Sequence, residues 1–208
     1  MNNNSTISHI CNKIFRQSIE DYHITDNVDA PLQNPYAPES LDHLLYKKNW
    51  IDTVQWHLED IIRDPNISSQ DALLIKRRID QSNQHRTDIV ERIDKWFLDC
   101  YKDIKPLPHA SVNTESPGGA VDRLSILALK IYHMYVETLR LDVGEDHRRS
   151  CRLKLEILLF QKKDLSDAID LLLQEIESGT KIMKVYFQMK MYNDNSLNPV
   201  LYNAKQRI

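Results

Sequence analysis

Apolar residues recur every three or four positions along most of the chain, which is the spacing of one face of an amphipathic helix. The pattern predicts five helices, at residues 7–19, 41–64, 70–100, 117–139 and 145–178. Residues 184–192 instead alternate apolar and polar side chains, a period of two that predicts an extended strap. No second segment is a convincing strand and only four glycines are present, so we expect an all-α helical bundle with an extended C-terminal strap.

The third helical segment contains a polar interruption. From Asp80 to Asp88 there is no apolar side chain, yet the apolar register set by Ile79 continues through Asn83 and Arg86 without a change of phase. The helix is therefore expected to run straight through, with Ser69 as its N-cap, and to turn Asn83 and Arg86 inward. A buried guanidinium or amide without partners loses several kcal/mol of hydration, so polar groups must face them.

Two other segments carry polar groups that can meet this one. Residues 120–139 are apolar around most of their circumference, which is typical of a central helix. The polar stripe of that segment comprises Asp122, Arg123, Lys130, His133 and Glu137. Beside the apolar face of residues 41–64 lie Asn49, Thr53, His57 and Asp60, next to Trp50 and Trp56. We expect the three helices to converge near Asp60 and to form one polar site.

Composition limits the class of protein. With 208 residues, of which 41% are hydrophobic, the chain can form a substantial core, and we expect residues 1–208 to form a single domain. The charged fraction is 27% and the net charge is -3, so no broad basic surface favours nucleic acid or an anionic membrane as a partner. No apolar run approaches the roughly 20 residues of a membrane span, and the start MNNNSTISHI does not resemble a signal peptide.

The three cysteines, Cys11, Cys100 and Cys151, are scattered and lack the paired spacing of a zinc site. They are expected to be reduced thiols that act as small core residues. Together with the missing export signal, this pattern predicts a cytoplasmic protein without a membrane span.

Four blocks of the sequence resemble a bacterial family known only as a domain of unknown function, family 4254. The blocks, which span almost the whole chain, are WHLEDIIRD (56–64), KRRIDQSNQHRTDIVERID (76–94), ESPGGAVDRLSILALKIYHM (115–134) and KVYFQMKMYND (184–194). Members are often encoded among glycosyltransferases for lipopolysaccharide and other surface polysaccharides, so the resemblance implies a biosynthetic setting and no reaction.

The resemblance also emphasises particular polar positions. They are His57, Glu59, Asp60, Arg63, Asp80, Asn83, Gln84, Arg86, Asp88, Asp122, Arg123, Ser125 and Lys130. Most of them coincide with the groups that helical periodicity places together. Helical projection puts Glu59 and Arg63 on the outer face, which argues against a direct role for these two.

The cationic side chains of the site suit an anionic ligand. Arg86, Arg123 and Lys130 offer donors for phosphate or carboxylate. In the competing interpretation, Arg86 and Arg123 pair with Asp60 and Asp122 inside the bundle. The sequence SPGG at 116–119 fits a helix start with proline in its first turn better than a phosphate-binding loop, because no Gly-Lys-Ser/Thr follows.

Metal chemistry is the weaker alternative. His57 and Asp60 are three residues apart, and Glu20 with His23 repeats the Glu-x-x-His spacing of di-iron bundles. A di-iron site needs two such motifs and two further inward carboxylates, and Glu20 and His23 stand where the first helix is expected to end. A single divalent ion held by carboxylates stays possible, and its identity is open.

Two functional hypotheses follow. In the first, the protein binds or acts on a phosphorylated sugar, sugar nucleotide or similar anion, and whether it is an enzyme is open. The candidate catalytic or metal-binding pair is His57 and Asp60, and the candidate substrate-binding residues are Asn83, Arg86, Asp122, Arg123, Lys130 and His133. In the second, a non-catalytic helical adaptor organises polysaccharide-biosynthesis enzymes or forms a homo-oligomer, and residues 145–178 supply the interface.

Overall fold

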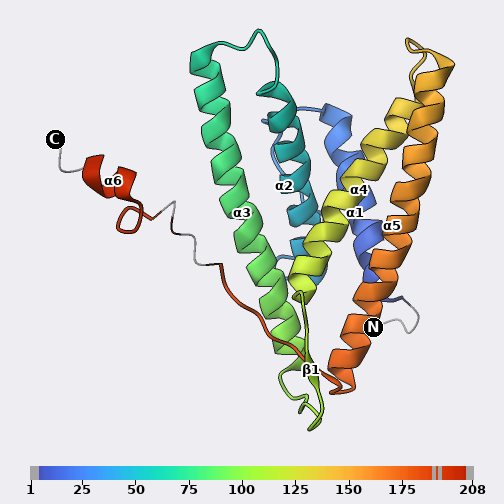
Figure 1. Cartoon of the computed structure of the whole chain (residues 1–208), viewed down its shortest axis with the longest axis vertical. Helices are drawn as coiled ribbons and strands as arrows, with labels where there is room; N and C mark the ends of the chain where they lie inside the picture. The colour runs from blue at the N-terminus through green and yellow to red at the C-terminus, as the bar shows by residue number, and fades with distance from the viewer. Residues whose placement is uncertain (1–4, 189–190, 192–193, 205–208) are drawn as a thin grey trace.

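The computed structural model describes residues 5–188, 191 and 194–204, and it is a bundle of long helices (Figure 1). The helices are α1 (Ile7–Thr25), α2 (Leu41–Ile61), α3 (Ser69–Tyr101), α4 (Pro117–Leu139), α5 (Glu145–Glu177) and the short α6 (Pro199–Ala204). The strands β1 (Ser111–Val112) and β2 (Lys181–Ile182) form one parallel pair of two residues each. The expected all-α bundle with five long helices is therefore confirmed.

Helix α3 runs without a break through the polar stretch 80–88, as its register predicts. It begins one residue earlier than expected, because Ser68 is the N-cap and accepts a hydrogen bond from Asp71 N at 3.0 Å. Its buried face consists of Ile79, Ser82, Ile89, Ile93, Asp94 and Phe97. Cys100, near its end, is exposed, so the expectation of a core position is wrong for this cysteine.

Helix α1 is longer than the sequence pattern suggests. The prediction that it ends near Ile19 is wrong, because Tyr22 continues the buried face and is fully enclosed. The helix ends only at Asp26, which adopts a left-handed conformation (φ 45°) and donates its backbone N–H to Tyr22 O. The extra turns carry His23 into the bundle.

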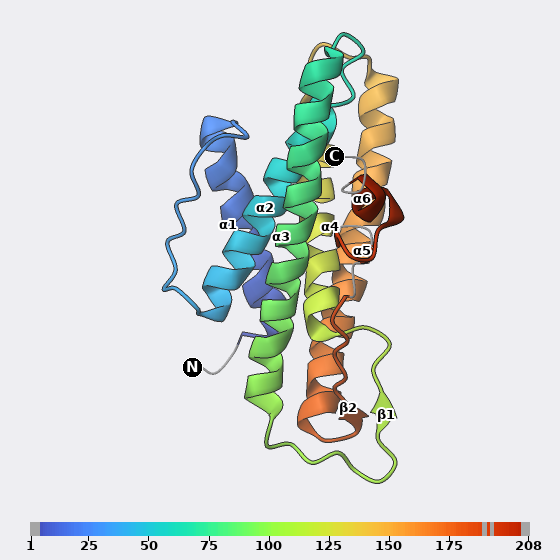
Figure 2. The ribbon, with the colours of Figure 1, turned by 90° about the vertical axis from the view of Figure 1, so that its left-hand side faces the viewer.

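Helix α4 lies at the centre, in contact with α1, α2, α3 and α5 (Figure 2). Its start approaches α3 so closely that a Cβ atom on Gly118 would lie 2.7 Å from the Asp94 carboxyl carbon and 2.8 Å from Val90 O. Glycine is therefore required where these two helices meet.

The segments that follow α5 close the lower end of the bundle. Gly179, with φ +75°, ends α5 as expected, and its carbonyl accepts a hydrogen bond from Leu107 N at 2.8 Å. Residues 183–188 then run without helix or strand across α3, as the expected strap does (Figure 1). Met189, Lys190 and Tyr192 of the expected alternation lie outside the described residues. Within the described part of the chain, no helix combines the length and apolar character that crossing a membrane requires.

Candidate functional site

A network of four charged side chains lies inside the bundle where α2, α3 and α4 meet. Lys48 and Asp52 of α2 are fully buried and form an ion pair one turn apart. Lys48 Nζ also lies 2.6 Å from Asp122 Oδ1 of α4. From α3, Arg86 Nε lies 2.7 Å from Asp52 Oδ1 and Nη2 lies 3.1 Å from Asp122 Oδ1. Two cations and two carboxylates thus neutralise one another.

Uncharged groups complete the network. Ser125 Oγ donates to Asp52 Oδ2 at 2.6 Å and accepts from Asn49 Nδ2 at 3.0 Å. Thr53 Oγ1 donates to Asn49 O at 2.9 Å. Among the described residues, buried Asn49 Oδ1 has no hydrogen-bond partner. Buried polar groups normally have partners, so this oxygen is an acceptor left over inside the site.

The charges hold one another in their ionised forms. Burial by itself would raise the pKa of Asp122, but Lys48 and Arg86 beside it hold that pKa below its usual range. Burial also opposes the charge on Arg86, yet Asp52 and Asp122 raise the pKa of its guanidinium. Asp122 and Arg86 therefore stay charged at neutral pH.

Sequence reasoning missed two members of this network, Lys48 and Asp52. The expected pairing of Arg86 with Asp60 is wrong, because Arg86 pairs with Asp52, two turns earlier in α2, whereas its contact with Asp122 agrees with the competing interpretation. Lys48 and Asp52 form an i, i+4 pair that continues the buried row of Leu41 and Leu45, and this spacing was the available signal. Lysine is almost never fully buried unless it is paired, so Lys48 by itself does not indicate a core position.

Two cavities flank Arg86, whose side chain is 24% exposed. The smaller, of about 290 Å³, is lined by Asp52, Gln55, Trp56, Glu59, Asp60, Arg63, Arg86 and Ile126. The larger, of about 570 Å³, is lined by Asn83, Arg86, Thr87, Val90, Glu91, Asp94, Glu115, Ser116, Gly119, Asp122, Arg123, Tyr186 and Gln188. Both are comparable in size with small-molecule sites, for which about 300–1,000 Å³ is typical.

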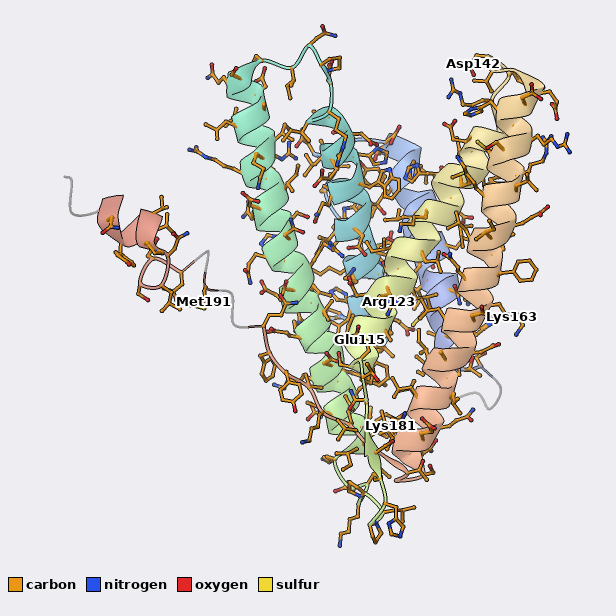
Figure 3. All side chains as sticks on the ribbon, in the orientation of Figure 1. Glu115, Arg123, Asp142, Lys163, Lys181 and Met191 are labelled. Carbon is orange, nitrogen blue, oxygen red and sulfur yellow. The ribbon has the colours of Figure 1, made fainter. Side chains whose placement is uncertain are left out.

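The structure gathers four predicted substrate-binding residues, Asn83, Arg86, Asp122 and Arg123, around the larger cavity. Asn83 faces inward as expected and accepts a hydrogen bond from Gln55 Nε2 at 2.8 Å. Arg123 is exposed near the start of α4, just above Glu115 (Figure 3). Lys130 is exposed and borders neither cavity.

The remaining predicted residues divide between two places. Asp60 is exposed and borders the smaller cavity, as do Glu59 and Arg63, which pair at 2.7 Å. Projection onto the outer face is thus correct in part, because both side chains are substantially exposed while they line the cavity mouth. His57 faces away from Asp60, toward His133 and α1.

The start of α4 is already occupied by a protein carboxylate. Asp94 Oδ1 accepts from Gly118 N and Oδ2 accepts from Ser116 Oγ, both at 2.6 Å. Ser116 Oγ also caps Gly119 N at 3.0 Å. Burial raises the pKa of Asp94 even though these donors oppose the shift. Because Asp94 takes the place of an external anion, SPGG acts as a helix start, in line with the preferred interpretation of the sequence.

These features define a class: an all-α protein in which three helices enclose a neutral ion network between two cavities. The chain belongs to the family described as Protein of unknown function (DUF4254), whose match covers residues 42–185 and so includes the network and nearly all of the lining of both cavities. Comparison with curated proteins and with solved structures finds no match.

Proposed function

We propose that the protein binds a sugar phosphate or sugar nucleotide, or a similar hydroxylated anion, in the cavities on either side of Arg86. The observation that carries the proposal is the position of Arg86, which is fixed by two carboxylates yet borders both cavities. A hydrogen-bond donor held rigidly at the edge of a cavity is preorganised for a ligand and loses little entropy on binding.

The lining of the larger cavity favours the sugar part of such a ligand. Four carboxylates, from Glu91, Asp94, Glu115 and Asp122, line it alongside two guanidinium groups. Carboxylates accept hydrogen bonds from sugar hydroxyls, whereas they repel phosphate. In the smaller cavity, Trp56 offers an aromatic face, which suits the apolar face of a sugar ring.

The anionic part of the ligand is assigned to Arg123. This guanidinium is exposed at the mouth of the larger cavity, and no ion pair or hydrogen bond to it occurs within the described part of the chain. Its charge is thus available, unlike those of Lys48 and Arg86. We keep Asp60 as the candidate acid or base at the smaller cavity and assign no reaction. The setting implied by the resemblance is surface-polysaccharide biosynthesis, and the cysteine pattern favours the cytoplasm.

Calorimetric titration tests the proposal, with a panel of nucleoside diphosphate sugars and hexose phosphates as probes. The wild type is expected to bind at least one probe, and Arg123→Ala to weaken that binding about tenfold or more, equal to about 1.4 kcal/mol, at unchanged thermal stability. Arg149→Ala removes an exposed arginine from α5 and is the matched control. If no probe binds the wild type, or if Arg149→Ala weakens binding as much as Arg123→Ala, the proposal is wrong.

One observation favours the adaptor as a second candidate. Leu153, Ile157 and Phe160 follow one another at helical spacing along α5 and are 56%, 58% and 69% exposed. An exposed apolar row of this kind is common at protein interfaces. If none of the sugar nucleotides and hexose phosphates binds the wild type, the ion network has only a structural role and the adaptor becomes the preferred function.

A further inference from the structure

Three histidines from three helices meet outside the ion network and both cavities. His23 lies in the last turn of α1, His57 in α2 and His133 in α4. Tyr22 and Trp56 lie against them, so the group occupies a half-buried aromatic pocket. The proximity arises from the two additional turns of α1, which neither the spacing of Glu20 and His23 nor that of His57 and Asp60 indicates.

The ring nitrogens have the separation of metal ligands. His57 Nε2 lies 3.3 Å from His23 Nε2. A tetrahedral zinc ion, with zinc–nitrogen bonds of about 2.0–2.1 Å, separates its ligand nitrogens by about 3.3–3.4 Å. One ring nitrogen of His133 completes a triangle in which all three atoms lie within 4.8 Å of one another. A small side-chain rotation is enough to bring the third nitrogen to bonding distance.

Hydrogen bonding directs a lone pair into the triangle. His23 Nδ1 lies 2.7 Å from Ile19 O, and a carbonyl oxygen can only accept, so Nδ1 carries the proton. In neutral His23 the lone pair is therefore on Nε2, the atom that faces His57. A histidine ligand normally donates its other N–H to a carbonyl or carboxylate in this way, which fixes its tautomer and orientation.

His133 provides independent evidence for a ligand, because one of its ring nitrogens lacks a partner in the described part of the chain. Its Nε2 is buried and has no hydrogen-bond partner among the described residues. The ring is held in place by Trp56, which stacks on it at 4.6 Å with an interplanar angle of 6°. A buried ring nitrogen without a partner, on a ring that stacking holds in place, is positioned as the nitrogen of a metal ligand would be.

We propose that His23, His57 and His133 bind one zinc ion, or a divalent transition metal of similar preference, with a fourth position left for an oxygen ligand. Asp26 is the nearest carboxylate, with Oδ1 3.7 Å from His57 Nε2, and its left-handed backbone holds it at the edge of the triangle. Three imidazoles suit zinc, copper, nickel and iron but not magnesium or calcium, which prefer oxygen. Three protein ligands and one open position are characteristic of catalytic zinc sites.

A second group of potential ligands, Glu137, His147 and Cys151, is less suited and provides an internal control. The Glu137 carboxylate is half-buried and already pairs with Arg140 at 3.1 Å and with His147 at 3.1 Å. Its negative charge is therefore neutralised without a metal. His147→Gln changes one ligand of this group by the same substitution that tests the first.

The test begins with full-length protein stripped of metal by a chelator and titrated calorimetrically with Zn²⁺. We expect one saturable site per chain, and a rise in melting temperature of about 5–10 °C at a hundredfold excess of Zn²⁺ over the dissociation constant. Co²⁺ in place of Zn²⁺ should give the intense visible absorption of a tetrahedral ion. Absence of saturable Zn²⁺ binding by the wild type would refute the proposal without any variant.

The variants locate the site. His23→Gln and His133→Gln are expected to weaken Zn²⁺ binding at least about a hundredfold and to abolish the Co²⁺ spectrum, whereas His147→Gln retains both. Because His23 is replaced at a helix end and His133 at the bundle centre, at least one variant should keep its helical circular dichroism. If the folded His23→Gln and His133→Gln variants bind Zn²⁺ as tightly as the wild type, or if His147→Gln loses Zn²⁺ binding, the metal lies elsewhere and the assignment is wrong. None of these outcomes depends on whether a sugar anion binds.

Discussion

Arg86 distinguishes the two interpretations of the polar interior, a ligand-binding site and a purely structural ion network. In the ligand-free protein it pairs with Asp52 and Asp122, so its removal leaves one uncompensated carboxylate beside Lys48. We expect Arg86→Met to lower the free energy of unfolding by about 2–4 kcal/mol, below the cost for a fully buried pair because Arg86 is partly exposed. Urea unfolding at pH 7 measures this.

The matching control uses the second partner. Adding Asp122→Asn to Arg86→Met removes the stranded charge and is expected to recover about half of the loss. Arg149→Met on the outside of α5 should change stability by less than about 0.5 kcal/mol. An Arg86→Met variant as stable as the wild type would mean that the two carboxylates do not need this cation, and that Arg86 serves a ligand alone.

The sequence identifies Asn83 and Arg86 as inward-facing because helical phase is a local property of one segment. It does not identify Asp52 as their partner, because the rotation and axial shift of α2 against α3 are set by packing between helices. For the same reason, His57 and Asp60 look like a pair in projection, but one turns toward α1 and the other toward a cavity.

At the scale of elements, the crossing of α3 and α4 determines the shape of the larger cavity. Gly118→Ala would place a methyl group 2.7 Å from the Asp94 side chain and 2.8 Å from Val90 O, and backbone cannot yield as a side chain does. We expect a loss of about 1–3 kcal/mol in stability, measured by urea unfolding. Gly144→Ala is the comparison, since no atom beyond its chain neighbours lies within 4 Å of the added methyl group there, and its effect should stay below about 1 kcal/mol, the cost of alanine at an N-cap. Equal effects of the two substitutions would mean that α4 can shift freely.

The long helices are predictable from the sequence because continuous apolar registers and capping residues such as Ser40 and Ser116 are local signals. The end of α1 is less predictable: Tyr22 keeps the register of Ser18 and Ile19, but no further apolar residue of that face follows it, and its burial depends on contacts with α2. Tertiary packing thus decides whether His23 belongs to the bundle.

At the scale of the molecule, protection of the helices should follow their position. Helix α4 is covered by α1, α2, α3 and α5, whereas α5 leaves Leu153, Ile157 and Phe160 exposed. Hydrogen exchange is expected to be slowest at residues 124–129, where it requires global unfolding, and at least about tenfold faster at residues 153–160. If both segments exchange equally slowly, and residues 153–160 lose this protection when the protein is diluted, self-association covers α5.

The position of Trp56 makes its fluorescence sensitive to both proposed ligands. One face of its indole stacks on His133, and the same side chain lines the smaller cavity beside Arg86. The chain has only two other tryptophans, Trp50 and Trp96, and replacing both by phenylalanine would leave Trp56 as the single tryptophan, which can be excited at wavelengths that tyrosine does not absorb. A paramagnetic ion bound by the three imidazoles would quench its fluorescence, and a sugar entering the cavity would displace water from the ring and shift its emission. The fluorescence of Trp56 would then distinguish the two ligands, because the metal ion lowers its intensity and the sugar shifts its emission wavelength.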